Sequence, residues 1–382
     1  MLFLERKYFL KEIGFWDYSC PRHGSLERYN ENDWDILLDD MAQGGFNSLV
    51  LGVKWLTTGY RSRFPWLDRD PACSAVKTDN GILHYALNAA RARQIKTRLL
   101  IVENQFPVKT FGLEPVWAPE GTKEAFGEYF GCYDLDHPGL RERMLEMTDE
   151  IVRLFGAETD GFVLELEFGD RDEPHRVDIY NRWARENGRP DYQTIKNIDL
   201  QPRSFPFTHW RDFTTQRRID IFKELEAVIR AAGFAGELST IAELENSPMA
   251  VIGNMNFGMV RQQTPACSLV TYDSIYDRNQ NRLATMDFCV VQPKTFGFTV
   301  YYLSRGVMPW ANDPSVFGPL EEQWKMTLED AKRFNPDGLW FMGSDCRMDD
   351  GVVCGVRNLA KFGFTNGREA RLKLLKTAGQ TT

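Results

Sequence analysis

The sequence predicts one (β/α)8 barrel, an α/β fold that occupies residues 1–382 as a single domain with long loops on its C-terminal face. Apolar strand-like runs alternate with amphipathic helical patterns, which is typical of parallel strands joined by crossover helices. Eight such runs occur, the number that a closed barrel of this kind requires. A chain of 382 residues with 43% hydrophobic residues is also long enough to bury one large core.

The structural alternative is a doubly wound open sheet. It usually brings a glycine-rich first turn that binds a nucleotide. Neither GxGxxG nor GxxxxGK[ST] occurs in the sequence, which favours the barrel.

The predicted strands share a short apolar run, and in chain order they are 12–17, 48–54, 97–103, 161–167, 237–243, 268–273, 298–303 and 338–342. The predicted helices share an amphipathic pattern, and they are 31–43, 81–93, 138–155, 213–232, 320–334 and 367–378. Gly233 stands where the longest of them should stop. The helix between the sixth and seventh strands is poorly marked, and residues 284–296 would have to supply it. Long loops follow the second, third and fourth strands, at the end where barrel enzymes assemble their active sites.

The fourth predicted strand carries two glutamates on one side. Side chains alternate along a strand, so Val163, Glu165 and Glu167 face one way and the neighbouring apolar residues face the other. The apolar side should pack against helices, which directs Glu165 and Glu167 into the barrel mouth. A carboxyl group beside an apolar wall and a second carboxylate has a raised pKa and can act as a general acid. The structural alternative is a buried ion pair with an arginine such as Arg98 or Arg305.

Other acidic residues end neighbouring strands and should meet the first pair if the barrel closes. Those expected to be catalytic or to bind substrate are Glu243, Glu245, Asp273, Glu103 and Asp17, with Tyr272 beside Asp273. For Glu243, Glu245, Glu103 and Asp17, a hydrogen bond that fixes a loop or a solvated charge at the rim remains an equal alternative. His175 is the one histidine expected near the cavity, and a structural role stays open for it.

A cavity with carboxylates and aromatic side chains suits a carbohydrate. Glycoside hydrolysis needs an acid for the leaving oxygen and a second group that supports the oxocarbenium-like centre. Aromatic faces pack against the C–H surfaces of a sugar ring. The tryptophans in the predicted post-strand segments are Trp55, Trp66, Trp117, Trp210 and Trp310.

Charge and cysteine content exclude several classes of function. The formal charge is −8 with dispersed basic residues, so neither a nucleic-acid partner nor an anionic membrane surface is expected. The seven cysteines form no CxxC pair, and we expect no metal and no cofactor. The N-terminal segment lacks a continuous apolar run, which predicts a cytoplasmic protein unless a leader has been removed.

Two motifs resemble family 18 glycoside hydrolases, the chitinase-like barrels. DGFVLELE, residues 160–167, is similar to their DGxDxDxE strand, with Glu167 at the position of the catalytic acid, but with Val163 and Glu165 where that motif has Asp. VTYD, residues 270–273, is similar to their M-x-Y-D motif, and Trp340 to their tryptophan at the cavity floor. The serine-glycine-glycine motif of the third strand is replaced by LLIVEN.

This resemblance, and the wider likeness to barrel glycoside hydrolases, implies a hydrolase with a retaining mechanism. Glu167 would be the acid/base, and Glu165 or Asp273 would orient a 2-acetamido group of the substrate. Two other functions stay open: a carbohydrate-binding barrel without catalysis, which Val163 motivates, and a metal-dependent sugar lyase or isomerase. A homo-oligomer is also compatible with the sequence.

Overall fold

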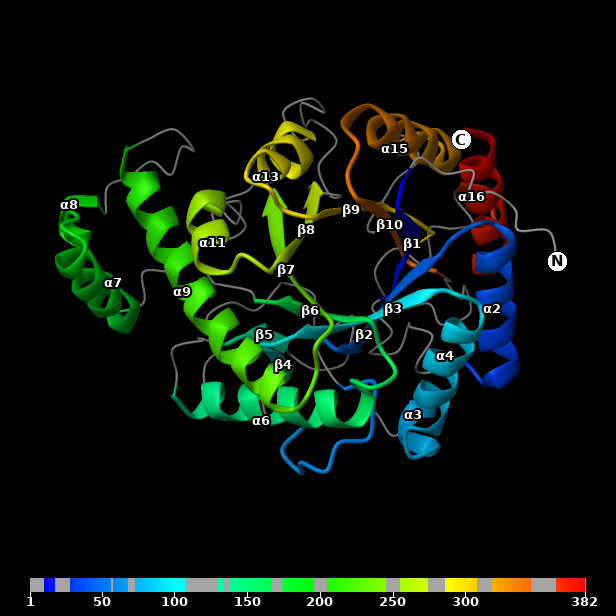
Figure 1. Ribbon diagram of the computed structural model, residues 1–382, viewed down its shortest axis with the longest axis horizontal. Coiled ribbons are helices and arrows are strands. Elements are labelled where there is room, and N and C mark those ends of the chain that lie inside the picture. Colours follow the sequence, from blue (N-terminus) through cyan, green and yellow to red (C-terminus); the bar gives the residue numbers. More distant parts are fainter. Residues whose placement is uncertain are drawn as a thin grey trace.

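The computed structural model describes residues 10–17, 28–55, 58–67, 73–107, 130–133, 138–166, 174–195, 205–244, 255–273, 286–307, 318–344 and 362–381. Within these ranges the chain forms a closed barrel of parallel strands with helices around it (Figure 1). The predicted fold class is therefore confirmed.

The eight barrel strands follow the predicted runs closely, and they are β1 (Glu12–Asp17), β2 (Ser48–Lys54), β3 (Lys96–Val102), β6 (Gly161–Glu165), β7 (Glu237–Leu244), β8 (Ser268–Asp273), β9 (Val300–Arg305) and β10 (Gly338–Met342). Around the barrel their order is β1-β10-β9-β8-β7-β6-β3-β2. Strand β1 pairs with β10 on one side and with β2 on the other, which closes the ring.

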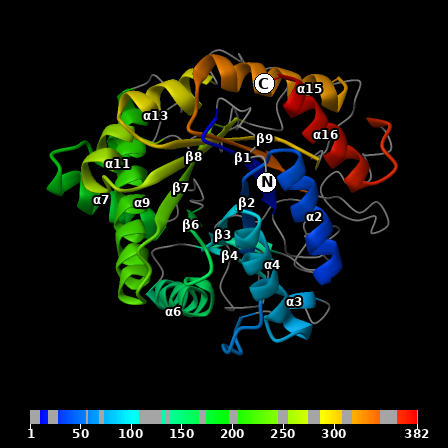
Figure 2. The same ribbon diagram turned by 45° about the vertical axis from the view of Figure 1, so that its right-hand side comes forward.

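The predicted helices form around this ring (Figures 1 and 2), and they are α2 (Glu31–Gln43), α4 (Gly81–Ala92), α6 (Pro138–Phe155), α9 (Phe205–Ala231), α15 (Leu320–Phe334) and α16 (Gly367–Thr381). Local sequence sets several of their ends. Asn30 and Asp33 form a reciprocal capping box at the start of α2. Gly233 adopts a φ of 92° just after α9, which confirms the predicted helix stop.

Several elements were not predicted, and they are the hairpin of β4 (Gln105–Pro107) with β5 (Phe130–Cys132), α3 (Ser74–Lys77), α7 (Pro174–Glu186), α8 (Tyr192–Ile195) and α11 (Phe257–Gln263). The weakly marked helix at 284–296 forms as a π-helical turn, Asp287–Val291, followed by α13 (Gln292–Thr295). The Thr271 hydroxyl on β8 donates to the Cys289 carbonyl inside that turn, at 2.6 Å. This bond satisfies a carbonyl in the turn and ties it to the barrel.

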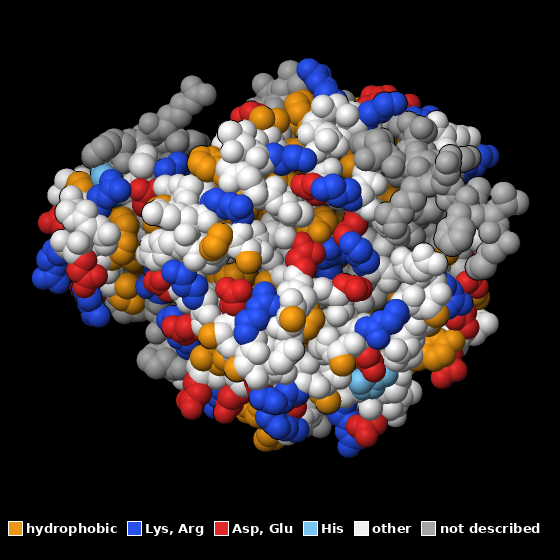
Figure 3. Space-filling model, viewed as in Figure 1, with side chains coloured by type: hydrophobic (Ala, Val, Ile, Leu, Met, Phe, Trp, Pro, Cys, Tyr) orange, Lys and Arg blue, Asp and Glu red, His pale blue; other side chains and the backbone are white. Residues whose placement is uncertain are grey.

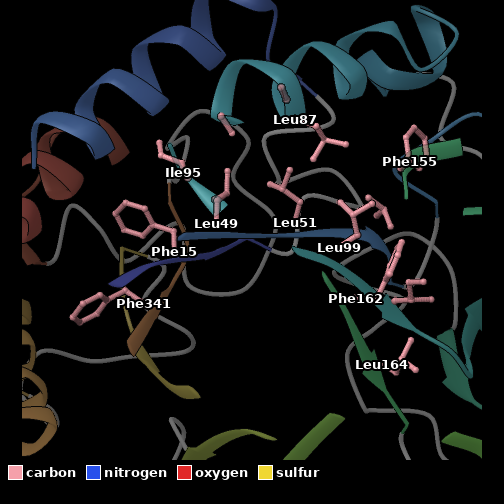
Figure 4. Close-up of a cluster of buried hydrophobic side chains, with 14 of the residues drawn as sticks. Phe15, Leu49, Leu51, Leu87, Ile95, Leu99, Phe155, Phe162, Leu164 and Phe341 are labelled. Carbon is pink, nitrogen blue, oxygen red and sulfur yellow. The ribbon is translucent and has the colours of Figure 1, made fainter. Parts of the chain in front are cut away.

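The two sides of the strands enter different cores. Figure 4 shows part of the outer core. Outward-facing strand residues such as Phe162 and Leu164 belong to the same cluster as helix residues such as Leu87 of α4. The inner cluster fills the barrel, and its members are Trp16, Val50, Leu100, Val102, Val163, Ile241, Val270, Tyr272, Tyr301, Leu303, Trp340 and Met342. Val163 lies inside while Phe162 and Leu164 lie outside, so the alternation predicted for the fourth strand is confirmed.

A charged floor closes the N-terminal end of the barrel. Arg98 on β3 donates to Glu12 on β1 at 2.7 Å and to Glu237 on β7 at 2.6 Å. Its guanidinium also lies 4.6 Å from the centroid of the Tyr301 ring, a cation–π distance. Arg98 thus pairs with carboxylates at the opposite end of the barrel from the β6 glutamates, and the predicted ion pair between Arg98 and those glutamates is wrong. The side chain of Arg305 lies outside the described residues.

A further, smaller core lies outside the barrel, between α7, α8 and α9, the helices at the left of Figure 1. Helices α7 and α8 and the first half of α9 enclose aromatic side chains that contact one another, and these are Tyr180, Trp183, Tyr192, Trp210 and Phe213. Trp210 is 6% exposed there. Trp210, one of the tryptophans of the predicted post-strand segments, therefore belongs to this helical core and not to the barrel mouth.

The surface shown in Figure 3 carries basic and acidic side chains interspersed, without a continuous patch of one sign on that face. In the part of the chain that the structure describes, no helix combines the length and the apolar character needed to cross a membrane.

Candidate active site

Glu165 is the residue on which the candidate site is built. It ends β6 at the C-terminal side of the barrel, and it is 3% exposed. It has the same strand parity as Val163 of the inner cluster, so its side chain is directed to the barrel interior. The Glu165 carbonyl accepts the main-chain N–H of Glu103 at 3.0 Å, which holds the ends of β3 and β6 together. The strand that carries this carboxylate is therefore fixed at its last residue.

Two stacked aromatic side chains line the barrel nearer its floor, on strands across from the one that carries this carboxylate. Trp340 on β10 stacks on Tyr301, with centroids 4.4 Å apart and an interplanar angle of 5°, and its indole N–H donates to Ser48 at 3.0 Å. Around the ring, β9, β8 and β7 separate β10 from β6 on one side, and β1, β2 and β3 separate them on the other. Trp340 therefore stands across the barrel from the strand that carries Glu165.

Two other predicted binding residues lie beside the interior. Tyr272 is a buried member of the inner cluster, and Trp55, just after β2, is partly buried and packs against that cluster. The barrel interior thus combines a buried carboxylate at the end of β6 with Tyr272 and Trp55 toward the same end of the barrel, while Tyr301 and Trp340 lie nearer the floor. This is the combination that the sequence predicted for a carbohydrate site.

The remaining candidates are described in part or not at all. Glu167, Glu245 and Trp310 lie outside the described residues. For Glu243, Asp273 and His175 the structure describes the main chain alone: Glu243 pairs with Tyr272, Asp273 ends β8 beside Leu244, and His175 lies in the first turn of α7. The roles of these six residues remain predictions.

Asp17 and Glu103 do not point into the barrel. The Thr148 hydroxyl on α6 donates to both carboxylate oxygens of Glu103, at 3.1 and 3.2 Å. The Ser344 hydroxyl donates to Asp17 at 2.5 Å. Asp17 ends β1 and Glu103 follows β3, each has the strand parity of outward-facing residues, and each accepts from a hydroxyl group. Both carboxylates therefore have the structural hydrogen bond that was the alternative to a role in the barrel mouth.

Burial gives Glu103 an unusual titration. Removal from water raises the pKa of this carboxyl to about 8, although the Lys54 ammonium and the Thr148 hydroxyl act in the opposite direction. In the unfolded chain the group should titrate near its ordinary value of 4.5. Between these two values the folded protein keeps a proton that the unfolded chain has released, so stability should fall as the pH rises through this window.

We expect Glu103→Gln to remove this part of the pH dependence, because glutamine fills similar space and does not titrate. The wild-type free energy of unfolding should fall by up to about 1.4 kcal/mol per pH unit across the window relative to the variant. Urea unfolding at several pH values between about 5 and 9 measures both slopes. Glu146→Gln, on the exposed side of α6, is the control. Parallel curves for Glu103→Gln and the wild type would contradict the assigned shift.

Lys54 is a charged residue at the mouth that the sequence reasoning did not single out. It ends β2, its side chain is buried, and it donates to main-chain carbonyls of Trp55, Val102 and Gln105. A signal was present: in SLVLGVK, Lys54 has the parity of Ser48, Val50 and Gly52, and a lysine on the inner side of a barrel strand needs partners. Within the described ranges, no group of three His, Cys, Asp or Glu residues is placed to hold a metal ion.

The chain was compared with known proteins. No family model and no curated protein sequence matches it. Solved structures of similar fold include a β-galactosidase from Rahnella sp. R3, with a TM-score of 0.60 and 13% identity over 98% of this chain and 57% of the other. An endo-1,4-β-D-mannanase from Thermotoga petrophila RKU-1 has a TM-score of 0.55 and 9% identity over 98% of this chain and 100% of the other.

An endocellulase from Pyrococcus horikoshii is a third similar structure, with a TM-score of 0.50 and 13% identity over 97% of this chain and 93% of the other. The present chain spans little more than half the length of the β-galactosidase. At these identities the likeness establishes the barrel fold, and the chemistry has to be argued from the site.

Proposed function

We propose that this chain is a glycoside hydrolase whose acid groups lie at the end of β6. The observation that carries the proposal is the placement of Glu165, a buried carboxylate on the inner side of a barrel strand, at the C-terminal end where barrel enzymes carry out chemistry. The similar solved structures are named as a galactosidase, a mannanase and an endocellulase, which supports the same class of activity.

The proposed substrate is a carbohydrate, whose ring would lie between the carboxylates of β6 and the aromatic side chains of the inner cluster. Glu167 acts as the acid that protonates the leaving oxygen. Glu165, or Asp273, supports the positive charge that develops at the anomeric carbon or orients a substrate group that does so. Glu243, Glu245 and Tyr272 are proposed to contact the sugar. In this assignment the reaction retains the anomeric configuration.

Hydrolysis of a panel of 4-nitrophenyl glycosides tests the proposal. The α- and β-linked derivatives of glucose, galactose, mannose and N-acetylglucosamine cover both anomers and the substrate with a 2-acetamido group. We expect release of 4-nitrophenol from at least one of them, and proton NMR of the first product should show the anomer of the substrate. Inversion would overturn the retaining assignment, and absence of any cleavage would overturn the hydrolase assignment.

A barrel that binds carbohydrate without hydrolysis is the second candidate. It is favoured by Val163, which is buried in the inner cluster where the family 18 motif has an aspartate. Calorimetric titration with the same sugars separates the two functions. Binding without product after prolonged incubation would support this candidate over the enzyme.

A further inference from the structure

The ammonium group of Lys54 joins the ends of two barrel strands. Lys54 is the last residue of β2, and its side chain is buried. Its Nζ donates to the Val102 carbonyl at 2.9 Å, to the Gln105 carbonyl at 2.5 Å and to the Trp55 carbonyl. An ammonium group has three N–H donors, which matches these three carbonyls in number. Of the three acceptors, Val102 ends β3, Gln105 begins β4, and Trp55 follows β2.

Burial of a lysine is costly, and here three main-chain carbonyls accept from its ammonium group. The Glu103 carboxyl acts on it through space, and the Phe106 ring lies with its centroid 4.1 Å from Nζ. Removing an ammonium ion from water costs several kcal/mol, which a methionine of similar length would avoid. The charge therefore indicates a requirement for donors at this point, because buried carbonyls that have left the strand ladder need partners.

The strand geometry shows why these carbonyls converge. The register between β2 and β3 shifts between Gly52 and Lys54, so that Lys54 pairs with Ile101. Such irregularities bend a strand and redirect the next side chains, and they occur often beside active sites. Here Lys54 comes directly after the irregularity and is followed by Trp55, the partly buried aromatic residue that packs against the inner cluster.

The hydrogen bonds of Lys54 also reach the β4–β5 hairpin. Gln105 begins β4, and Asn104 is bonded reciprocally to Tyr133: the Tyr133 N–H donates to the Asn104 carbonyl at 2.9 Å, and the Asn104 side-chain amide donates to the Tyr133 carbonyl at 3.0 Å. Lys54 thus connects the main chain at Trp55 to a hairpin that is itself fixed. A main chain held in this way fixes the point from which the Trp55 side chain extends, and the indole packs against the inner cluster.

We propose that Lys54 is a positioning residue for a sugar-binding subsite at Trp55: its buried ammonium fixes the main chain so that the indole face is held ready at the barrel mouth. This inference rests on the proposed carbohydrate function. A platform that is ordered in advance spares the ligand the cost of ordering it, so Lys54 contributes to sugar affinity through Trp55 without touching the sugar.

A double-mutant cycle between Lys54→Met and Trp55→Ala tests this. The probe is the 4-nitrophenyl glycoside that the wild type cleaves best, and the readouts are KM, kcat and the Kd from calorimetry in a Glu165→Gln background. We expect Lys54→Met to raise KM and Kd by about fivefold to tenfold, with a smaller change in kcat. In the Trp55→Ala background the same change should have almost no further effect, because the platform is already absent.

Lys96→Met is the matched control. Lys96 lies at the other end of the barrel, where it pairs with Glu12 at 2.7 Å and is 54% exposed, and its replacement should leave KM unchanged. If Lys54→Met fails to fold, Lys54→Gln carries the same cycle, since its amide keeps two N–H donors. A general structural effect would weaken binding equally in both backgrounds, and additive effects would overturn the proposal.

The two proposals fail in different ways. A wild type that neither binds nor cleaves any sugar of the panel removes the carbohydrate function itself. The role of Lys54 alone is overturned by a different pattern. In that pattern the wild type binds or cleaves a sugar of the panel, Trp55→Ala binds it weakly, and Lys54→Met binds it as well as the wild type.

Discussion

Glu165→Gln will lower kcat/KM on the best-cleaved aryl glycoside by about 10²- to 10⁴-fold, the range typical of a lost acid or base group. Glutamine has nearly the same shape as glutamate, so the inner end of β6 should keep its packing. What is lost is the negative charge, which in a buried and largely apolar barrel interacts strongly with a developing positive charge. Steady-state kinetics on the variant, with circular dichroism to verify folding, measures the effect.

The control for this prediction is Glu158→Gln, the same change just before the other end of β6. Glu158 is 25% exposed and contacts His84 on α4 at 2.7 Å, outside the barrel interior. We expect its replacement to leave kcat/KM within about twofold of the wild type. Glu167→Gln should be at least as severe as Glu165→Gln if Glu167 is the acid. Wild-type rates in a folded Glu165→Gln protein would remove that carboxylate from the mechanism.

The second large effect is expected at the barrel floor, where Arg98→Met should cost about 3–5 kcal/mol of unfolding free energy. Arg98 is 2% exposed at its side chain, and its ion-pair partners Glu12 and Glu237 are 4% and 25% exposed. Methionine fills much of the volume but leaves two carboxylates without their shared cation. Urea unfolding at neutral pH measures the loss, which should appear as a lower midpoint with an unchanged slope.

The pH dependence gives this prediction a second measurement. Burial opposes ionisation of Glu12, but Arg98 and Lys96 outweigh it and hold the pKa of that carboxyl below its usual value. A lowered pKa contributes stability above the unfolded value, and that contribution is lost as the pH falls through the folded value. Arg98→Met should therefore show a weaker loss at acid pH than the wild type.

A variant that removes both the cation and its carboxylate partners distinguishes the effect of the lost ion pairs from the effect of lost packing. The triple variant Arg98→Met, Glu12→Gln, Glu237→Gln should recover much of the stability that Arg98→Met loses, because no uncompensated charge remains buried. If the triple variant is as unstable as the single one, the defect is one of packing against Tyr301 and Trp340, whose rings lie beside the guanidinium.

The sequence predicts the barrel well because its signals are local. Each strand is a short apolar run, and the helices begin and end with chemistry that a few residues specify, as Asn30 and Gly233 show. The β4–β5 hairpin escaped prediction because β4 and β5 have three residues each and are held by contacts with distant chain, such as Asn104 with Tyr133. Helix α11, with seven residues, is likewise too short for a periodic pattern to stand out.

The candidate site was predictable to the extent that strand parity was applied. Parity placed Glu165 inside the barrel, on the side of Val163. The same rule gives Glu103 the parity of Leu99 and Ile101, which face the helices, so its contact with Thr148 was within reach of the sequence. The contacts of Lys54 could not be predicted in this way, because its partners are main-chain carbonyls that no sequence pattern marks.

The aromatic core of α7, α8 and the first half of α9 has a consequence for how this protein can diverge. Its buried side chains form a cluster separate from those that line the barrel and its surrounding helices, while the second half of α9 packs on the barrel through residues such as Phe222 and Leu225. Substitutions in this outlying cluster should therefore have little effect on the packing of the barrel strands. Sequence changes in the segment that follows β6 can thus accumulate at little cost to the stability of the barrel.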